Sequence, residues 1–491
     1  MVPKLQAIPE SIRQIVTILQ RAGFQAYLVG GCVRDLLLNL KPKDWDITTN
    51  AKPEQIVTLF PKTFYENSFG TVTVHDPDAA DPTLKNVEIT PFRLEAKYSD
   101  QRHPDTVTFS TKLEDDLGRR DFTINALALD PATDKLIDLY AGQKDIVDRV
   151  VRAVGQPDKR LAEDPLRLLR AVRLATELGF TIEAQTERAI RETADQLKAI
   201  SSERIREEFI RIVNSSQPLV GIKLMSKLGL LLHVAPELEA GIDMKQNGDH
   251  KYDVWEHTLR VAQHAADKDF PLHVRLGALF HDIGKPPTRQ WSKEKDDWTF
   301  YGHDVVGAKI TRQIMQRLRF GKKISEVVEK LVRNHMFFTD TEKITLSAVR
   351  RLIRSVGPEN VWDLMKIRAC DRIGMGRPKE NPYRLRKYES MIEEAMRNPT
   401  SVAMLKIKGE QVLHETKLGP GPKVGHILHA LLEEVLDKPE LNSEEYLISR
   451  AKKLAEMGEQ ELENLGQKGK EKKKNVEEGE LKKIRDRHWV K

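Results

Sequence analysis

The chain has 491 residues, of which 31% are charged and 40% are hydrophobic. At about 150 residues per domain, this length predicts about three folded units and excludes a single small binding module. The net charge of +6 mildly favours a polyanionic partner, and the two cysteines, Cys32 and Cys370, are too few for a disulfide framework or a cysteine-rich zinc site.

Any metal site must therefore use histidine and carboxylate ligands. The sequence contains no apolar run of about 18 residues, and its first residues lack the apolar core of a secretory signal. We therefore expect a cytoplasmic protein without a membrane segment.

The first part of the chain alternates between helix and strand. Apolar residues at helical spacing predict a helix over 12–22, which Gly23 ends before an apolar strand over 26–29. Further short strands are predicted at 46–48, 71–74, 87–90 and 107–109. Strand signals fade after about residue 155, where Leu, Ile and Val recur at helical intervals. The sequence thus predicts an α+β head followed by a long helical body.

Loop-rich breaks divide the helical body. They lie at 246–249, 376–379 and 419–422, and Lys and Glu dominate the chain after Gly466. Because this end has few apolar residues, we expect it to be solvated or disordered. The expected segments are a head over 1–150, a neck over 151–245, a histidine-containing body over 246–376, a helical tail over 377–465 and a charged end over 466–491.

A glycine turn follows the strand over 26–29. Gly30 and Gly31 lead into a predicted helix that begins with Cys32, Val33 and Arg34. Glycines let the backbone approach a ligand closely, a helix N-terminus favours negative charge, and an arginine pairs with phosphate oxygens. The turn is thus a candidate phosphate site, although an ordinary strand-to-helix turn has the same pattern.

Two aspartates follow about ten residues later. In a strand, Asp44 and Asp46 point to the same face, and such like charges repel unless cations lie between them. Mg²⁺ prefers one or two carboxylates plus substrate phosphates, and two such ions suit phosphoryl or nucleotidyl transfer. Glu88, in the strand over 87–90, is a candidate third catalytic carboxylate. A solvated turn and an exposed strand glutamate are the alternatives.

The stretch from Gly30 to Asp46 resembles the first motif of the class II template-independent nucleotidyltransferases, which are the CCA-adding enzymes and bacterial poly(A) polymerases. The stretches over 119–128 and 138–149 resemble the second and third motifs. The resemblance implies a polymerase-β-like nucleotidyltransferase head, with a mixed sheet and helices, followed by an all-α neck, body and tail. It also implies ribose and triphosphate contacts, for which the candidate residues are Gly30, Gly31, Arg34, Arg119, Arg120, Asp121 and Asn125.

A helix beginning near Pro165 has an arginine at every third position. Asp164 suits its N-cap, and an aspartate acceptor with an arginine fork can read the Watson–Crick edge of a base. From the residues alone, a capped helix with a solvated basic face is the alternative. The family resemblance implies that Asp164 and Arg167 select the incoming base, while Arg170 and Arg173 contact phosphates.

Two further stretches resemble CCA-adding enzymes rather than poly(A) polymerases. These are 68–74 and 95–104, and the second resembles the flexible loop that addition of the terminal A requires, with Asp100 and Arg102 as its candidate residues. An intact loop argues against an enzyme that adds only CC. An enzyme that adds only A remains an alternative.

Histidines and carboxylates recur along separate helical segments of the body. His281 and Asp282 are adjacent and cannot both lie comfortably in an apolar core, whereas a bound Mn²⁺, Ni²⁺ or Fe²⁺ would explain them. A lone helical histidine is more often structural. The candidate metal ligands are His257, His281, Asp282, His303, His335 and Asp371.

Four of these residues in this order, His257, His281, Asp282 and Asp371, resemble the HD phosphohydrolase superfamily. In addition, His303 and His335 match the extra positions of its two-metal members. The resemblance implies phosphomonoesterase or 2′,3′-cyclic phosphodiesterase chemistry at a damaged tRNA end. The tail over 405–428 resembles the part of CCA-adding enzymes that holds the tRNA elbow.

The sequence is therefore interpreted as a CCA-adding tRNA nucleotidyltransferase with an HD domain. Asp44 and Asp46 would hold Mg²⁺, and the partners would be tRNA, ATP and CTP, with no protein partner implied. The alternatives are an A-adding enzyme, a poly(A) polymerase, or an HD phosphohydrolase whose head only binds RNA. Two facing carboxylates argue against the last alternative, because a binding head does not need them.

Overall fold

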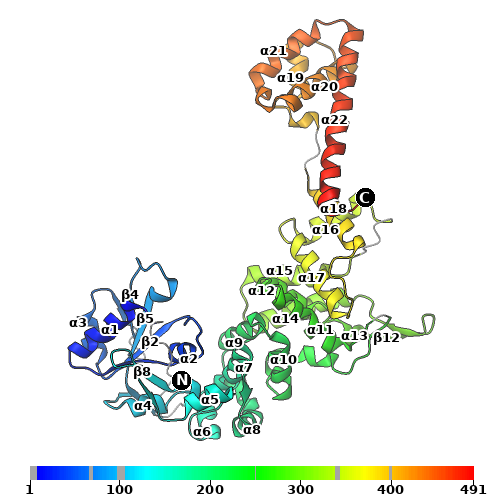
Figure 1. Cartoon of the computed structure of the whole chain (residues 1–491). Coiled ribbons are helices and arrows are strands. Elements are labelled where there is room, and N and C mark those ends of the chain that lie inside the picture. The colour runs from blue at the N-terminus through cyan, green and yellow to red at the C-terminus, as the bar shows by residue number, and fades with distance from the viewer. Residues whose placement is uncertain are drawn as a thin grey trace. The chain divides into compact units, whose positions relative to one another are not determined.

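The computed structural model describes residues 8–65, 70–96, 106–248, 250–337, 343–397 and 401–490. The chain forms two compact units (Figure 1). Unit 1 comprises Met1–His335 with Lys366–Pro378, and unit 2 comprises Met336–Met365 with Lys379–Lys491. Among the described residues, no helix combines the length and the apolar character that a membrane span requires.

The head of unit 1 is built on a seven-stranded sheet with the order β3-β4-β5-β2-β1-β8-β9. Its β2–β5 pair is parallel and its other pairs are antiparallel, which confirms the expected mixed sheet. A separate antiparallel ribbon joins β6 and β7. The strands of the head are β1 (Ala26–Val29), β2 (Trp45–Thr49), β3 (Thr63–Tyr65), β4 (Val72–His75), β5 (Asn86–Pro91), β6 (Arg93–Ala96), β7 (Thr106–Phe109), β8 (Leu127–Asp130) and β9 (Lys135–Asp138).

Helices cover both faces of this sheet. Helix α1 (Glu10–Arg21) buries Ile12, Val16 and Leu19, so the helix expected over 12–22 is present. In β1 and β8, Leu28 and Leu129 join the main core, while the residues next to them along each strand pack in a smaller cluster with α4 on the opposite face. The other helices of the head are α2 (Gly31–Leu37), α3 (Pro53–Leu59), α4 (Leu113–Gly118) and α5 (Gly142–Asp148).

The rest of unit 1 is mainly helical, as expected. One continuous apolar core extends from α1 to α15, through the head, the neck and the histidine-containing region. The helices are α6 (Pro157–Glu163), α7 (Leu166–Leu178), α8 (Ala184–Thr193), α9 (Ser202–Asn214), α10 (Pro218–Lys227), α11 (Val254–Asp267), α12 (Leu272–Phe280), α13 (Lys285–Thr288), α14 (His303–Arg317) and α15 (Lys322–Asn334), and α17 (Val361–Gly374) enters unit 1 at Lys366.

The expectation that strands end near residue 155 is only partly correct. Short strands β10 (Val150–Val151) and β11 (Thr181–Ile182) pair in parallel, and β12 (Gln290–Ser292) forms a hairpin with β13 (Asp297–Thr299). Two or three residues are too few to show an alternating pattern, so these strands give no periodic signal in the sequence.

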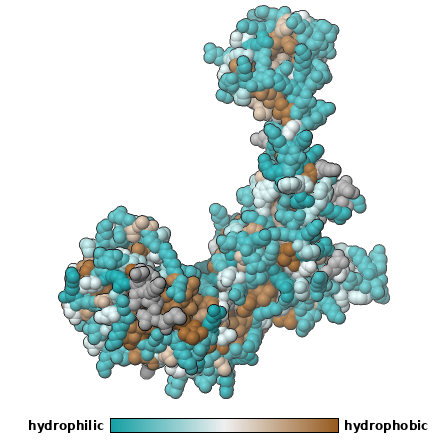
Figure 2. Space-filling view, viewed as in Figure 1, coloured by the Kyte–Doolittle hydropathy of each residue, from teal (hydrophilic) through white to brown (hydrophobic). Residues whose placement is uncertain are grey.

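Unit 2 is helical where it is described. Its helices are α16 (Leu346–Val356), α18 (Tyr383–Met396), α19 (Gly409–Thr416), α20 (Pro422–Asp437), α21 (Glu444–Ala455) and α22 (Glu459–Arg487). A separate apolar core joins α19, α20, α21 and the start of α22. On the face shown in Figure 2, the surface is largely hydrophilic, with apolar residues scattered among polar ones.

The sequence predicts a solvated or disordered end over 466–491, and disorder is wrong for the described part of that end. Residues 459–487 form one helix, α22, which buries Leu462, Gly466, Gly469 and Ile484. A Cβ atom at Gly469 would lie 2.1 Å from the carbonyl oxygen of His429 in α20, so the two helix backbones approach closely there. The composition concealed this contact, because glycine rather than an apolar side chain makes the close packing possible.

A Gly469→Ala substitution is expected to lower the free energy of unfolding by about 1–3 kcal/mol, because the added methyl group overpacks the α20–α22 contact. Gly479→Ala is the matched control, since a Cβ atom there meets nothing within 4 Å. That control should stabilise α22 by up to about 1 kcal/mol through helix propensity. Urea unfolding of both variants measures the difference, and equal stabilities would contradict the close packing.

Candidate functional site

The turn after β1 brings three predicted residues together. Gly30 has φ of 80° and ψ of −136° at the N-cap of α2. A Cβ atom at Gly30 would lie 3.0 Å from Nη1 of Arg120 and 3.5 Å from Oδ2 of Asp46. Glycine is therefore required both by the backbone angles and by the approach of these two side chains.

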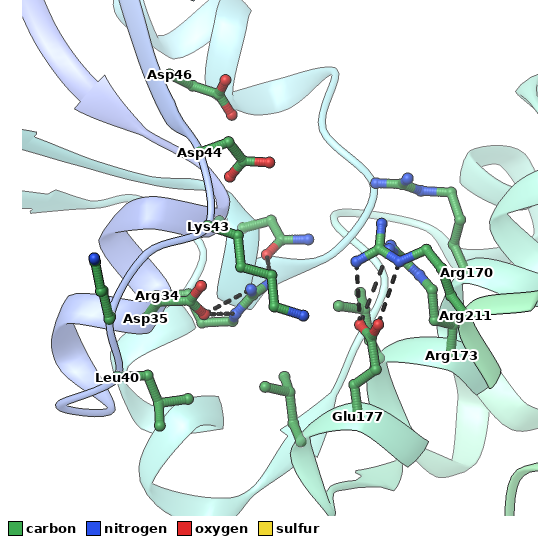
Figure 3. A pocket seen from close by; sticks show the side chains of 15 residues that line it. Arg34, Asp35, Leu40, Lys43, Asp44, Asp46, Arg170, Arg173, Glu177 and Arg211 are labelled. Carbon is green, nitrogen blue, oxygen red and sulfur yellow. Dashed lines mark hydrogen bonds and ion pairs between the residues drawn. The ribbon is translucent and has the colours of Figure 1, made fainter. Parts of the chain in front are cut away.

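Carboxylates cluster at the beginning of β2. Asp44 and Asp46 point to the same side of the strand, as expected (Figure 3). The parallel register places Asp46 beside Glu88 of β5. Burial raises the pKa of Asp46 to about 7, and the charges of Asp44 and Glu88 add to this effect while Arg120 opposes it. Such unfavourable proximity of carboxylates fits a site for divalent cations.

These carboxylates form one wall of a pocket of about 450 Å³, a size typical of small-ligand sites. Arg170, Arg173 and Glu177 of α7 and Arg211 of α9 lie across the pocket from Asp44 and Asp46 (Figure 3). The polar residues that line it are Gly31, Arg34, Asp35, Lys41, Lys43, Asp44, Asp46, Asn125, Arg170, Arg173, Glu177 and Arg211.

A hydrogen-bond network holds the cationic side chains of this pocket. Asp121 accepts hydrogen bonds from Nη2 and Nε of Arg170 at 2.6 and 2.9 Å, and from Nδ2 of Asn125 at 3.2 Å. Asn125 Oδ1 in turn accepts from Nη1 of Arg34 at 2.7 Å. Burial raises the pKa of Asp121, but the charges of Arg170 and Arg167 outweigh burial and hold it well below its usual range. Asp121 thus orients the groups that line the pocket.

Arg119 and Arg120 share a partner that the sequence analysis missed. Asp116 of α4 is fully buried and accepts from Nε and Nη2 of Arg119 at 2.9 and 2.8 Å, and from Nη2 of Arg120 at 3.2 Å. Its position in the run Glu114-Asp115-Asp116 resembled an ordinary acidic first helical turn. Among the described residues, neither Arg119 nor Asp121 lines the 450 Å³ pocket.

An Asp116→Ala substitution is expected to lower the free energy of unfolding by about 3–5 kcal/mol, because it leaves two largely buried guanidinium groups without their carboxylate. The exposed neighbour Glu114 provides a control, and Glu114→Ala should change stability by less than about 0.5 kcal/mol. Chemical denaturation would measure both, and a small effect at Asp116 would show that the two arginines find other partners.

The two residues predicted to select the base have partners elsewhere. Asp164 accepts from Nη2 of Arg204 at 2.8 Å and from the backbone N–H of Leu166 at 3.1 Å. Nη1 of Arg167 donates to Glu163 at 2.6 Å. Within the part of the chain that the structure describes, neither Asp164 nor Arg167 lines the 450 Å³ pocket. Asp100 and Arg102 of the predicted flexible loop, and Ser68 and Phe69, lie outside the described residues.

All six predicted ligands of the body meet in unit 1, in two groups. One group is His257, His281 and Asp371, and the other is Asp282, His303 and His335; within each group the ligand atoms lie within 4.8 Å of one another. Asp282 touches both: its Oδ2 lies 3.2 Å from Nε2 of His257, and its Oδ1 lies 3.4 Å from Nε2 of His303. These residues would therefore hold a divalent ion in each group, with Asp282 in contact with ligands of both.

Backbone contacts orient three of these histidines for metal binding. Nδ1 of His281, His303 and His335 each lies 2.7 or 2.8 Å from the carbonyl oxygen three residues earlier. An N–H donated from Nδ1 leaves the lone pair of Nε2 for a metal, and the Nε2 atoms are those that face the carboxylates. Sequence reasoning missed Lys285, which is buried and whose Nζ lies 2.6 Å from Oδ2 of Asp282.

Family patterns match three consecutive parts of the chain. Poly A polymerase head domain matches residues 26–152, "Probable RNA and SrmB- binding site of polymerase A" matches 179–242, and HD domain matches 254–397. A CCA-adding enzyme of Ligilactobacillus salivarius is 32% identical over 456 residues, which cover 92% of this chain and 99% of that enzyme. The chain belongs to the CCA tRNA nucleotidyltransferase family. It is thus a nucleotidyltransferase with an HD domain.

Members with different products are similar to this chain. A CC-adding tRNA nucleotidyltransferase of Thermus thermophilus is 33% identical, with 83% of this chain and 89% of that enzyme covered. An A-adding tRNA nucleotidyltransferase of Deinococcus radiodurans is 35% identical, with 67% of this chain and 76% of that enzyme covered. A CCA-adding enzyme of Lactobacillus helveticus is 46% identical over 213 residues, which are 43% of this chain and about half, 52%, of that enzyme.

The fold of a solved family member is also similar. The crystal structure of the Bacillus stearothermophilus CCA-adding enzyme in complex with CTP has a TM-score of 0.57 and 25% sequence identity. The match covers 91% of this chain and 98% of that one. The nucleotidyltransferase and HD families generally use divalent metals, and the carboxylate and histidine groups described above are suitable ligands.

Proposed function

We propose that this enzyme adds C, C and A to the 3′ end of tRNA from CTP and ATP, without a nucleic-acid template. The observation that supports this most strongly is the pocket in which Asp44 and Asp46 face Arg170 and Arg173 (Figure 3). Carboxylates for Mg²⁺ and guanidinium groups for a triphosphate are the two elements that nucleotidyl transfer requires. Family members named as CCA-adding enzymes support the choice of substrates.

In the proposed mechanism, Asp44 and Asp46 hold Mg²⁺, and Glu88 is a third candidate ligand. When bound, Mg²⁺ aligns the attacking and leaving oxygens and neutralises the charge that develops on them. Arg34, Arg170 and Arg173 bind the triphosphate, with the first two held in place through Asn125 and Asp121. Such preorganised cations stabilise the transition state as pyrophosphate leaves.

Base selection is assigned to Asp164 and Arg167. The carboxylate of Asp164 is bound by Arg204, and the guanidinium of Arg167 is bound by Glu163. In the described part of the chain, neither residue lines the pocket that contains Asp44 and Asp46, so contact with the base of a nucleotide bound there requires movement at the start of α7. The predicted loop residues Asp100 and Arg102 would serve addition of the terminal A.

A second proposed activity belongs to the HD domain. Its six ligands fit Mn²⁺, Ni²⁺ or Fe²⁺, which would activate water for attack on a phosphate ester. The substrate would be a tRNA end that bears a phosphate or a 2′,3′-cyclic phosphate and therefore cannot be extended. The contacts of Asp282 with histidines of both ligand groups support a two-metal hydrolase.

The test is extension of a tRNA that lacks its CCA end and of one that ends in CC, resolved to single nucleotides. With CTP and ATP, addition of C, C and A that then stops is the expected result. Addition of a single A to the CC-ended tRNA alone would replace the proposal by A-only activity, which the similar Deinococcus radiodurans enzyme makes the second candidate. A long A ladder would identify a poly(A) polymerase.

A further inference from the structure

A second pocket adjoins the one that contains Asp44 and Asp46. Its volume is about 320 Å³, and it shares Lys43, Glu177 and Arg211 with the first pocket. The remaining lining residues, Asn214, Ser215 and Ser216, come from the end of α9 and the loop that follows it. No sequence motif pointed to this pocket.

The charges in this pocket suit an anion. Lys43 and Arg211 are its cations, and both are exposed to solvent. Glu177 is the one carboxylate among the described lining residues, and its two oxygens accept from Nε and Nη2 of Arg211 at 3.2 and 3.3 Å. The carboxylate of Glu177 therefore binds the guanidinium of Arg211 from within the protein. The phosphate of a ligand could replace this carboxylate as the partner of Arg211.

The floor of this pocket is held from two other helices. Nη1 of the buried Arg275 in α12 donates to the carbonyl oxygens of Val213 and Ser215 at 3.3 and 3.0 Å. Nε2 of Gln263 in α11 donates to the carbonyl oxygen of Ser216 at 2.8 Å. These hydrogen bonds fix the loop after α9 before any ligand binds, so the pocket is preformed.

Template-independent transfer requires two polyanions at one site: a nucleoside triphosphate and the end of an RNA chain. Among the described lining residues, Arg34, Arg170 and Arg173 line only the first pocket, whereas Lys43 and Arg211 line both, so Lys43 and Arg211 are the cations that a second ligand can contact. Lys43 directly precedes Asp44, so a ligand that contacts Lys43 lies beside the proposed metal ligands. The position of the second pocket beside these metal ligands favours the RNA chain that is extended as its ligand, rather than a second nucleotide.

We propose that the 320 Å³ pocket binds a backbone phosphate near the 3′ end of the acceptor RNA, with Arg211 and Lys43 as its ligands. This inference rests on the nucleotidyl transfer proposed above. The phosphate replaces Glu177 as the partner of Arg211, and this contact positions the terminal hydroxyl beside Asp44 and Asp46. Phosphate contacts of this kind fix the register of the strand without reading its sequence.

The test compares three variants in extension of tRNA that lacks CCA. Arg211→Ala is expected to raise KM for tRNA about tenfold, to leave KM for CTP unchanged, and to reduce the salt dependence of tRNA binding by about one phosphate contact. Glu177→Gln should have the opposite effect and lower KM for tRNA, because it removes the competing carboxylate. Arg188→Ala is the control, since Arg188 is an exposed arginine on α8 that pairs with Glu192 outside this pocket.

A higher KM for CTP with an unchanged KM for tRNA would overturn the proposal and assign Arg211 to the nucleotide. Unchanged values for both substrates would also overturn it. Direct binding of labelled tRNA without nucleotides separates this inference from the proposed function. If the wild type adds no nucleotide at all, the proposed function fails, whereas weaker tRNA binding by Arg211→Ala would still support an RNA phosphate site.

Discussion

Asp46→Asn is expected to reduce nucleotide incorporation by at least about 100- to 1000-fold, the loss typical for one preorganised electrostatic group of an active site. The substitution removes a carboxylate ligand of the proposed Mg²⁺ site but keeps the size of the side chain. Rapid-quench extension of a CC-ended tRNA with ATP measures the effect. Asp134→Asn is the matched control, because Asp134 is a half-exposed aspartate of the head outside the pocket, and it should retain full activity.

Stability separates this loss of chemistry from unfolding. Burial and Asp44 raise the pKa of Asp46 to about 7 in the folded chain, above its ordinary value of 3.8. The folded state therefore binds the proton more tightly than the unfolded state, and without metal this group lowers stability as pH rises from about 4 to 7. Asp46→Asn should remove that decline, so its Tm at pH 8 should equal or exceed that of the metal-free wild type. A lower Tm would contradict the proposed repulsion.

Asp282→Asn is expected to reduce phosphate release from a tRNA that ends in a 3′-phosphate by at least about 100-fold. The carboxylate touches ligands of both groups, so its replacement should also reduce the bound transition metal from two ions per chain. Metal analysis after dialysis and malachite-green phosphate assays measure these two effects. Nucleotide addition should remain within about twofold of the wild type, because the head contains a separate set of carboxylates.

A second substitution guards against a folding defect at Asp282, since removal of that carboxylate leaves the buried Lys285 without its ion partner. His303→Ala affects only the second ligand group and should leave one ion bound. Two ions retained by both variants would contradict the proposed metal-binding role of these residues. Full phosphatase activity in both would show that hydrolysis occurs elsewhere or that the HD centre has another role.

The sequence predicted the carboxylates of the head and the ligands of the HD domain from short motifs of neighbouring residues. The spacing of Asp44 and Asp46 defined their common direction, because side chains alternate along a strand. The six HD ligands meet although the first and the last, His257 and Asp371, are 114 positions apart in the chain. The resemblance to the HD family predicted that these distant residues lie close together, which the periodicity of apolar residues does not indicate.

What escaped prediction depends on tertiary partners. Asp116 is a buried acceptor for two arginines, and Arg211 lines a pocket together with Lys43, yet each is an ordinary helical charge in sequence. Low hydrophobicity predicts a solvated or disordered charged end, although the described part of that end is helical. Gly466 and Gly469 instead allow α22 to approach α20 through backbone contact, which hydrophobicity does not measure.

The continuous apolar core of unit 1 makes the neck depend on the HD helices for its packing. Helix α12, whose C-cap residue is His281, packs against α9 of the neck, and residues of both helices belong to the same core as the head. Deleting the HD helices would expose the apolar faces on which the neck depends, whereas changing a metal ligand would leave them covered. A relative that lacks the proposed hydrolase activity is therefore expected to retain the HD helices as a scaffold, with substitutions at the metal ligands.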